Sequence, residues 1–290
     1  MGFLGGGNMA QGMIRRLLAS GHHVCVYNRT PAKLQGLVEL GAHIASTPRE
    51  AATGADAVIS MVGDDAAAEA VWLGETGALV APKKAGALAI ECSTLSHEWV
   101  TWFGRRAMGN EYRPIDCPVT GLPSAAARGE LRLLVGAAED VLAAARPILE
   151  PMSCDIVWFG EHGAGTRFKL ILNMMGAVQI AGAAEAMAMA KAANLDLAKV
   201  LHVISNGVAG APQVVRVVKN MVAEDHKHNI TFSANWRLKD VRYGVKLARD
   251  LKSNTPLGDA VQMMFERLQH LGLGDQNESA IVKVYGNESD

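Results

Sequence analysis

A glycine-rich loop near the start of the chain has residue types and spacing that can hold a pyrophosphate. The run Gly5-Gly6-Gly7-Asn8-Met9-Ala10 fits the pattern G-x-G-x-x-G/A. Glycines permit a tight turn and close backbone approach to phosphate oxygens, and a helix N-terminus favours their negative charge. Such a loop alone is weak evidence for a dinucleotide site, because glycines also build ordinary turns. It gains weight here because an apolar run precedes it and a helical run follows it.

A second candidate group lies at the end of the next expected strand, where the sequence reads Asn28-Arg29-Thr30. An NAD site would usually place Asp or Glu here, about twenty residues beyond the loop, and a carboxylate would repel the 2′-phosphate of NADP. The guanidinium of Arg29 and the hydroxyl of Thr30 would instead bind that phosphate. The alternative is a solvated arginine at a helix start. Together with the glycine loop, these residues predict NADP(H) as the cofactor.

The elements that must position these residues follow an α/β pattern. The first half alternates short apolar runs with helical stretches, which is typical of a parallel sheet wound on both faces. Strands are expected at 3–4, 24–27, 57–61, 88–91, 112–115, 131–135 and 156–159, and helices at 9–19 and from Pro31. Beyond residue 160 the strand signal stops, and the proline-free run 166–194 predicts a helix of roughly 40 Å. Further helices are expected at 198–205, 238–251 and 256–271.

Length and composition favour two domains. The chain has 290 residues, of which 49% are hydrophobic and 20% charged, so a sizeable core is expected rather than disorder. The sequence predicts a Rossmann-type, doubly wound NADP-binding domain at 1–161. A long connecting helix then leads into an all-helical substrate and dimerisation domain at 162–290. The net charge of −1 gives no field that would recruit nucleic acid or an anionic membrane.

The cysteines, the histidines and the apolar segments further narrow the class of protein. The four cysteines, at positions 25, 92, 117 and 154, lack CxxC spacing, and the nine histidines lack HExxH spacing. We therefore expect reduced thiols and no metal site. The start of the chain carries no basic region followed by an apolar one, so we expect a cytoplasmic protein. The apolar segment 174–193 is interrupted by Gln179, Glu185 and Lys191, which favours a buried helix over a membrane span.

The residues quoted above, with four further segments in the same order, resemble the β-hydroxyacid dehydrogenase family. That family includes 3-hydroxyisobutyrate dehydrogenases, tartronate semialdehyde reductases and glyoxylate/succinic semialdehyde reductases. The similarity runs from residue 2 to about residue 250 and covers both expected domains. The further segments are Glu91-Cys92-Ser93-Thr94, Asp116-Cys117-Pro118-Val119-Thr120-Gly121, the run from Gly163-Ala164-Gly165 to Lys169 and Asn173, and Leu238-Lys239-Asp240.

The resemblance implies an NADP-dependent oxidoreductase that moves a hydride between the nicotinamide and a small β-hydroxyacid or semialdehyde. Lys169 would be the general acid/base. Physical chemistry agrees, because hydride addition to a carbonyl leaves charge on oxygen that an ammonium can stabilise and protonate. Asn173 lies four residues further on and would share its helix face with Lys169. Taken alone, Lys169 could equally be a lysine whose stem packs along an apolar helix.

The resemblance assigns the remaining site residues as well. Thr120 and Gly121 would bind the substrate carboxylate, although the segment could also be a simple proline-rich turn. Thr94 would lie near the nicotinamide, unless it only caps the following helix. Val62 would pass over the ribose and pyrophosphate. Lys239 would reach the cofactor from the second domain, the alternative being an ordinary surface charge.

One departure bears on the substrate. The family's second glycine in the substrate segment is replaced by Leu122, which is followed by Pro123. A leucine removes backbone freedom and adds apolar bulk near the expected carboxylate pocket. Either the substrate carries an apolar group, or the carboxylate is held mainly by Thr120, Gly121 and Asn173.

Two other functions compete with this interpretation. An imine reductase shares the layout but usually replaces the lysine by aspartate or tyrosine, and a non-catalytic NADP-binding scaffold would have lost the lysine. The apolar 174–193 stretch also predicts pairing with a second copy, as a homodimer or homotetramer.

Overall fold

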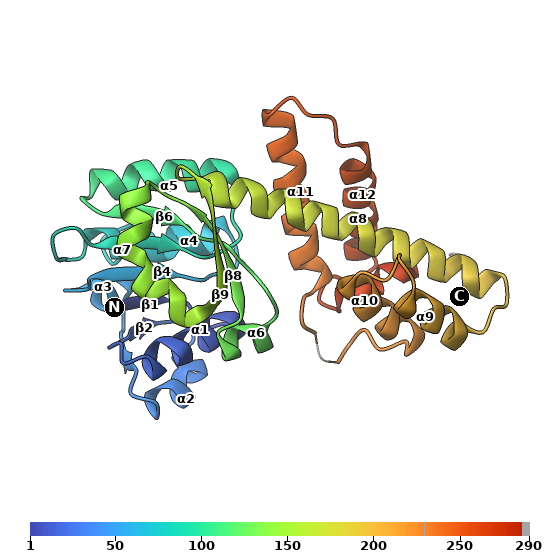
Figure 1. Ribbon diagram of the computed structural model, residues 1–290, viewed down its shortest axis with the longest axis horizontal. Coiled ribbons are helices and arrows are strands. Elements are labelled where there is room, and N and C mark those ends of the chain that lie inside the picture. The colour runs from blue at the N-terminus through green and yellow to red at the C-terminus, as the bar shows by residue number, and fades with distance from the viewer. Residues whose placement is uncertain (229, 286–290) are drawn as a thin grey trace. The chain divides into compact units, whose positions relative to one another are not determined.

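The computed structural model describes residues 1–228 and 230–285 (Figure 1). The chain divides into two compact units, Met1–Lys169 and the part that begins at Leu170. The division falls inside the long helix α8 (Ala164–Ala192), eight residues beyond the border expected from the sequence. The two units are described one at a time.

The first unit is built on a nine-stranded sheet in the order β3-β2-β1-β4-β5-β6-β8-β7, with β9 also paired to β8. Across the sheet, the first six strands, β3, β2, β1, β4, β5 and β6, are parallel to one another. Strand β8 is antiparallel to both β6 and β7, and β9 is parallel to β8. The strands are β1 (Gly2–Leu4), β2 (Cys25–Tyr27), β3 (His43–Ile44), β4 (Ala57–Ser60), β5 (Leu88–Glu91), β6 (Arg113–Asp116), β7 (Val119–Thr120), β8 (Leu131–Gly136) and β9 (Ser153–Gly160).

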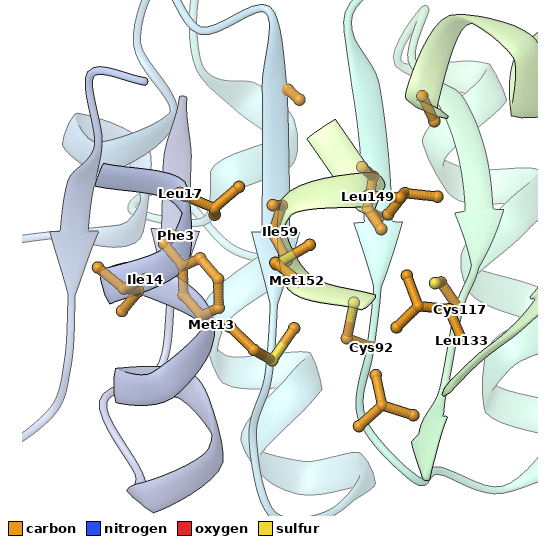
Figure 2. Packing of buried hydrophobic residues seen from close by; sticks show 14 of the residues in the cluster. Phe3, Met13, Ile14, Leu17, Ile59, Cys92, Cys117, Leu133, Leu149 and Met152 are labelled. Carbon is orange, nitrogen blue, oxygen red and sulfur yellow. The ribbon is translucent and has the colours of Figure 1, made fainter. Parts of the chain in front are cut away.

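Helices cover both faces of this sheet, and its central strands β1, β4 and β5 are buried on each side. Phe3 and Ile59 belong to one apolar cluster, which includes side chains of α1 and α7 (Figure 2). Their neighbours Leu4 and Val58 belong to the cluster on the opposite face. Strands buried on both faces read as continuous apolar runs, which is why the sequence revealed them. The helices are α1 (Asn8–Ala19), α2 (Gln35–Val38), α3 (Pro48–Ala52), α4 (Asp65–Trp72), α5 (His97–Gly109), α6 (Pro123–Arg128) and α7 (Glu139–Leu149).

The fold class predicted from the sequence is confirmed, with local differences. Strands β3 and β7 were missed because each has only two residues, too few for a periodic pattern. The sheet is mixed rather than purely parallel, since apolar runs carry no information on strand direction. The helix expected from Pro31 begins as a 3-10 turn, Pro31–Leu34, before α2.

The second unit is helical in its described part. Ala177, Ile180 and Ala184 of α8 pack with side chains of the later helices in one apolar core. Helix α8 is long and apolar enough to cross a membrane, with a mean hydropathy of 1.3, but core helices pass the same test. The helices after α8 are α9 (Leu197–Asn206), α10 (Pro212–Val222), α11 (Ala234–Asp250), α12 (Pro256–His270) and the 3-10 segment Glu278–Tyr285.

Candidate active site

The glycine loop lies where the strand order reverses. Strands β2 and β4 flank β1, and the loops after β1 and β4 both leave from the carboxyl edge of the sheet. Gly5 has a φ of +117°, and a Cβ atom there would collide with the carbonyl oxygen of Met61. Only glycine therefore lets the two loops approach so closely. Ligands of doubly wound sheets bind in the crevice at such a point.

Helix α1 presents an open N-terminus at this edge of the sheet. Gly7 is its N-cap, and in the described chain no side chain caps the helix and no acidic residue occupies its first turn. A Cβ atom on Gly7 would meet nothing within 4 Å. The first backbone N–H groups of α1, which begins with Asn8 and Met9, therefore have room for a phosphate. The loop fits the pyrophosphate of a dinucleotide.

One side chain that no sequence motif indicated connects the two loops predicted to bind the cofactor. Gln11 Nε2 donates to the carbonyl oxygens of Gly6 and Lys33, at 3.2 and 3.3 Å. Asn28 Nδ2 donates to the carbonyl oxygen of Thr30 at 2.8 Å, which shapes the turn after β2. Arg29 in that turn is exposed. Gln11 carried no recognisable signal, because its role depends on a loop more than twenty residues away.

The loops after β4 and β5 are joined through Ser93. The N–H of Val62 donates to Ser93 Oγ at 2.8 Å. The N–H of Ser93 in turn donates to Glu91 Oε1 at 2.9 Å, and Trp72 Nε1 donates to Glu91 Oε2 at 2.7 Å. Burial raises the pKa of Glu91 to about 7, against the effect of these hydrogen bonds. This buried network fixes the backbone at Val62 and beside Thr94, two predicted cofactor residues.

The cap of the next helix excludes one alternative for Thr94. Helix α5 is capped by Ser96, whose side chain accepts from the N–H of Trp99 at 3.2 Å. Thr94 is therefore not the N-cap of that helix.

A buried carboxylate on β6 fixes the start of α8. Asp116 Oδ1 accepts from the N–H of Gly163 at 2.6 Å, and Oδ2 accepts from the N–H of Thr166 at 2.7 Å. Burial raises the pKa of Asp116 to about 6. A Cβ atom on Gly136 would collide with Asp116 Oδ1, so the neighbouring strand must carry glycine there. Lys169 follows three residues after Thr166 and is mostly buried.

The predicted substrate segment leaves the same strand and forms β7 rather than a simple turn. Thr120 ends β7, opposite Arg132 of β8. Gly121 has a φ of +141°, a conformation that other residues rarely adopt. Leu122 has a φ of −96° and ψ of 167° as the N-cap of α6, so this backbone does not require glycine. The Leu122 side chain is exposed.

In the second unit, helix α11 holds Asn173 of α8 at two points. Asn173 Nδ2 donates to Asp240 Oδ2 at 2.6 Å. The backbone oxygen of Asn173 accepts from Arg237 Nη1 at 3.2 Å, while Arg237 Nε donates to the buried Glu278 at 2.6 Å. The side-chain amide and the backbone oxygen of Asn173, a predicted substrate residue, are thus both held by α11.

Lys239 on the same helix is not an ordinary surface charge. Its side chain is 16% exposed, and its Nζ lies 3.2 Å from Asp240 Oδ1. The ammonium also lies over the rings of Trp236 and Tyr243, at 5.4 and 5.3 Å from their centroids.

The predicted site residues thus fall into three groups. The first group lies in the loops at the carboxyl edge of the sheet and in the first turn of α1: Gly5, Gly7, Asn8, Met9, Asn28, Arg29, Thr30, Val62 and Thr94. The second group is Thr120 and Gly121, which follow Asp116 along the chain, with Lys169 on the helix whose start Asp116 holds. The second unit carries Asn173 and Lys239. Among residues 1–228 and 230–285, no group of three His, Cys, Asp or Glu could hold a metal ion. This fold, with a glycine loop where the strand order reverses, defines the class of two-domain, dinucleotide-binding proteins.

Comparisons with known proteins identify its family. Residues 1–160 match the NAD binding domain of 6-phosphogluconate dehydrogenase, and residues 163–285 match the family described as NAD-binding of NADP-dependent 3-hydroxyisobutyrate dehydrogenase. A 3-hydroxyisobutyrate dehydrogenase of Pseudomonas aeruginosa is 32% identical, over 98% of this chain and 97% of the relative. An NAD-dependent L-serine dehydrogenase of that organism is 31% identical, over 98% and 96%.

Comparison with solved structures supports the same family. The crystal structure of 3-hydroxyisobutyrate dehydrogenase from Salmonella typhimurium superposes with a TM-score of 0.90 at 25% identity, covering 98% of each chain. An imine reductase from Myxococcus stipitatus, at 18% identity and a TM-score of 0.62, shares the fold alone. The chain belongs to the 3-hydroxyisobutyrate dehydrogenase type of NAD(P)-dependent oxidoreductases, which act on CH–OH groups.

Proposed function

We propose that the protein transfers a hydride between NADP(H) and a small β-hydroxyacid or semialdehyde, with Lys169 as general acid/base. The observation that carries this proposal is the attachment of α8 to β6. Asp116 holds the first turn of the helix that bears Lys169, and its own strand leads into Thr120 and Gly121. One carboxylate thereby connects the predicted acid/base to the predicted carboxylate-binding segment.

In this proposal the cofactor supplies or accepts the hydride, and the chain supplies binding and proton transfer. The Thr120 hydroxyl and the N–H of Gly121 bind the substrate carboxylate. Asn173 binds the reacting end of the substrate. The Lys169 ammonium stabilises the charge that develops on the substrate oxygen and gives it a proton. In the oxidative direction the neutral amine of Lys169 takes that proton from the substrate hydroxyl.

The preference for NADP rests on Arg29 and Thr30. Both residues are exposed in the turn after β2, and neither Asp nor Glu occupies this turn. A guanidinium and a hydroxyl suit a phosphate, whereas a ribose diol would favour a carboxylate. One relative is named an NAD-dependent enzyme, and parallel titration with NADPH and NADH distinguishes the two cofactors for this chain.

The test is an NADPH-oxidation screen over short semialdehydes and 2-oxo acids, with Lys169→Ala measured in parallel. We expect turnover that falls about 10²–10⁴-fold in the variant while NADPH binding is retained. Lys199→Ala is the matched control, because Lys199 lies on the surface of α9 and should leave turnover unchanged. Tight NADPH binding without turnover of any carbonyl would contradict the proposal and favour an imine substrate or a scaffold.

Assembly and location are separate parts of the proposal. Met175 and Met189 of α8 and Val203 of α9 are exposed. Exposed apolar side chains on adjoining helices favour a homodimer or homotetramer. Light scattering at micromolar concentration tests this, and a monomer would contradict it. We further propose a cytoplasmic protein without a nucleic-acid or membrane partner.

A further inference from the structure

Asp240 is a buried carboxylate that contacts both of the predicted ligand-binding side chains of the second unit. Only 1% of the residue is exposed. Its Oδ2 accepts from Asn173 Nδ2 at 2.6 Å, and its Oδ1 lies 3.2 Å from Lys239 Nζ. Asn173 lies on α8 and Lys239 on α11, so one carboxylate connects a predicted substrate residue to a predicted cofactor residue.

The contact with Asn173 decides which atoms its amide can offer. A carboxylate only accepts hydrogen bonds, so it holds the NH₂ group and repels the amide oxygen. One N–H of Asn173 is committed to Asp240, which leaves the second N–H and Oδ1 for another ligand. Without the charge on Asp240, the amide could rotate and exchange donor for acceptor.

The contact with Lys239 restricts a long and otherwise flexible side chain. The ammonium lies over the rings of both Trp236 and Tyr243 and beside Asp240 Oδ1. A buried carboxylate also needs a counter-charge, since burying a lone charge is costly. Lys239 supplies that charge, and in return its position is fixed.

We propose that Asp240 is a positioning residue that sets the orientation of Asn173 for the substrate and of Lys239 for the cofactor. The inference rests on the proposed function, which supplies the roles of those two residues. Asp240 itself touches neither ligand in this scheme. It acts through the amide and the ammonium, and it couples substrate binding to cofactor binding within one unit.

The test is Asp240→Asn, which keeps the shape and removes the charge. NADPH affinity is measured by fluorescence titration, and the substrate KM by NADPH oxidation. We expect NADPH Kd and substrate KM each to rise roughly tenfold, the change expected for losing a hydrogen bond to a charged group. If this variant does not fold, the smaller Asp240→Ser carries the same expectation.

Double variants distinguish positioning from a merely structural role. In a Lys239→Ala background, Asp240→Asn should raise the NADPH Kd no further. In an Asn173→Ala background, it should raise the substrate KM no further. Ser279→Ala is the matched control, because it removes a buried hydrogen bond to His226 in the same unit. It should lower thermal stability and leave both constants unchanged.

An unchanged NADPH Kd in folded Asp240→Asn overturns the inference, as do effects that simply add in the double variants. Failure of the proposed function looks different, because the wild-type protein would then bind NADPH but reduce no carbonyl. In that case the NADPH titrations still decide the inference. A rise in Kd that disappears in the Lys239→Ala background supports it.

Discussion

Glu91 and Asp116 are register partners at the carboxyl ends of the neighbouring parallel strands β5 and β6. Both carboxylates are buried, and each accepts hydrogen bonds from the backbone of a predicted functional segment. Glu91 holds the turn at Ser93, and Asp116 holds the start of α8. The ends of these two strands thereby position both the predicted cofactor turn and the helix that bears Lys169.

Asp116→Asn should lower kcat by roughly 10²-fold, because a small displacement of a catalytic group is that costly. The amide cannot accept from both Gly163 and Thr166 with its two ends, so the first turn of α8 loosens beneath Lys169. Steady-state kinetics with NADPH titration tests this, and the NADPH Kd should stay near the wild-type value. Asp140→Asn, at an exposed ion pair with Arg113, is the control. Wild-type kcat in folded Asp116→Asn would refute the assigned role.

Glu91→Gln should change how stability depends on pH. The folded pKa of Glu91 is raised from 4.5 to about 7, so between these values the folded protein binds more protons than the unfolded chain. The contribution of Glu91 to stability is therefore fully present below about pH 4.5 and is lost as pH rises through 7. The shift corresponds to on the order of 3 kcal/mol.

Urea unfolding of wild type and Glu91→Gln between pH 4 and 8 measures this effect. The difference between the two proteins is the useful quantity, because burial lowers the pKa of His162 to about 4 and gives stability the opposite trend. The wild-type advantage should shrink as pH rises from 4.5 to 7. A difference that is constant over this range would show that Glu91 does not titrate there.

Arg29→Ser should raise the NADPH Kd by about 10–100-fold, the cost of charge-assisted hydrogen bonds to a phosphate. NADH binding should be nearly unchanged, since it lacks the 2′-phosphate. Arg49→Ser, at an exposed site on α3, controls for the loss of a surface charge. Parallel titration with both cofactors is the measurement. An equal loss for NADPH and NADH would argue against phosphate recognition by Arg29.

Gly7→Val should impair NADPH binding, whereas Gly5→Ala should impair folding stability. A Cβ atom at Gly7 would meet nothing within 4 Å and its φ of −71° suits any residue, so the variant should fold but fill the space predicted for the pyrophosphate. Gly5→Ala is strained by its φ of +117° and collides with Met61, so it should lose stability. Thermal melts with and without NADPH separate the two. NADPH stabilisation of Gly7→Val equal to wild type would place the pyrophosphate elsewhere.

Leu122→Gly should alter substrate preference more than stability. The backbone there is extended, and the side chain is exposed, so its loss should cost no more than about 1 kcal/mol. If the leucine contacts an apolar group of the substrate, kcat/KM should fall for branched substrates and not for unbranched ones. Identical ratios in both proteins would remove Leu122 from the determinants of specificity.

The sequence by itself determined the fold class, the family and most of the element order. The glycine loop, the apolar strands and the proline-free run at 166–194 are local signals, because strand and helix periodicities are written in neighbouring residues. Helix α8 occupies Ala164–Ala192, close to that expectation. The same signals gave no strand direction and missed the two-residue strands β3 and β7.

The tertiary structure alone decided what the buried carboxylates do. Asp116 lies 47 and 50 residues from its partners Gly163 and Thr166, and Asp240 lies 67 residues from Asn173. Both aspartates lie within sequence motifs, and nothing in those motifs indicates a role for either of them. A hydrogen bond over such a separation depends on how strands and helices pack, and no local periodicity records it. Chemistry-bearing residues could be recognised from their neighbours in sequence, whereas the residues that hold them in place could be recognised only in the folded chain.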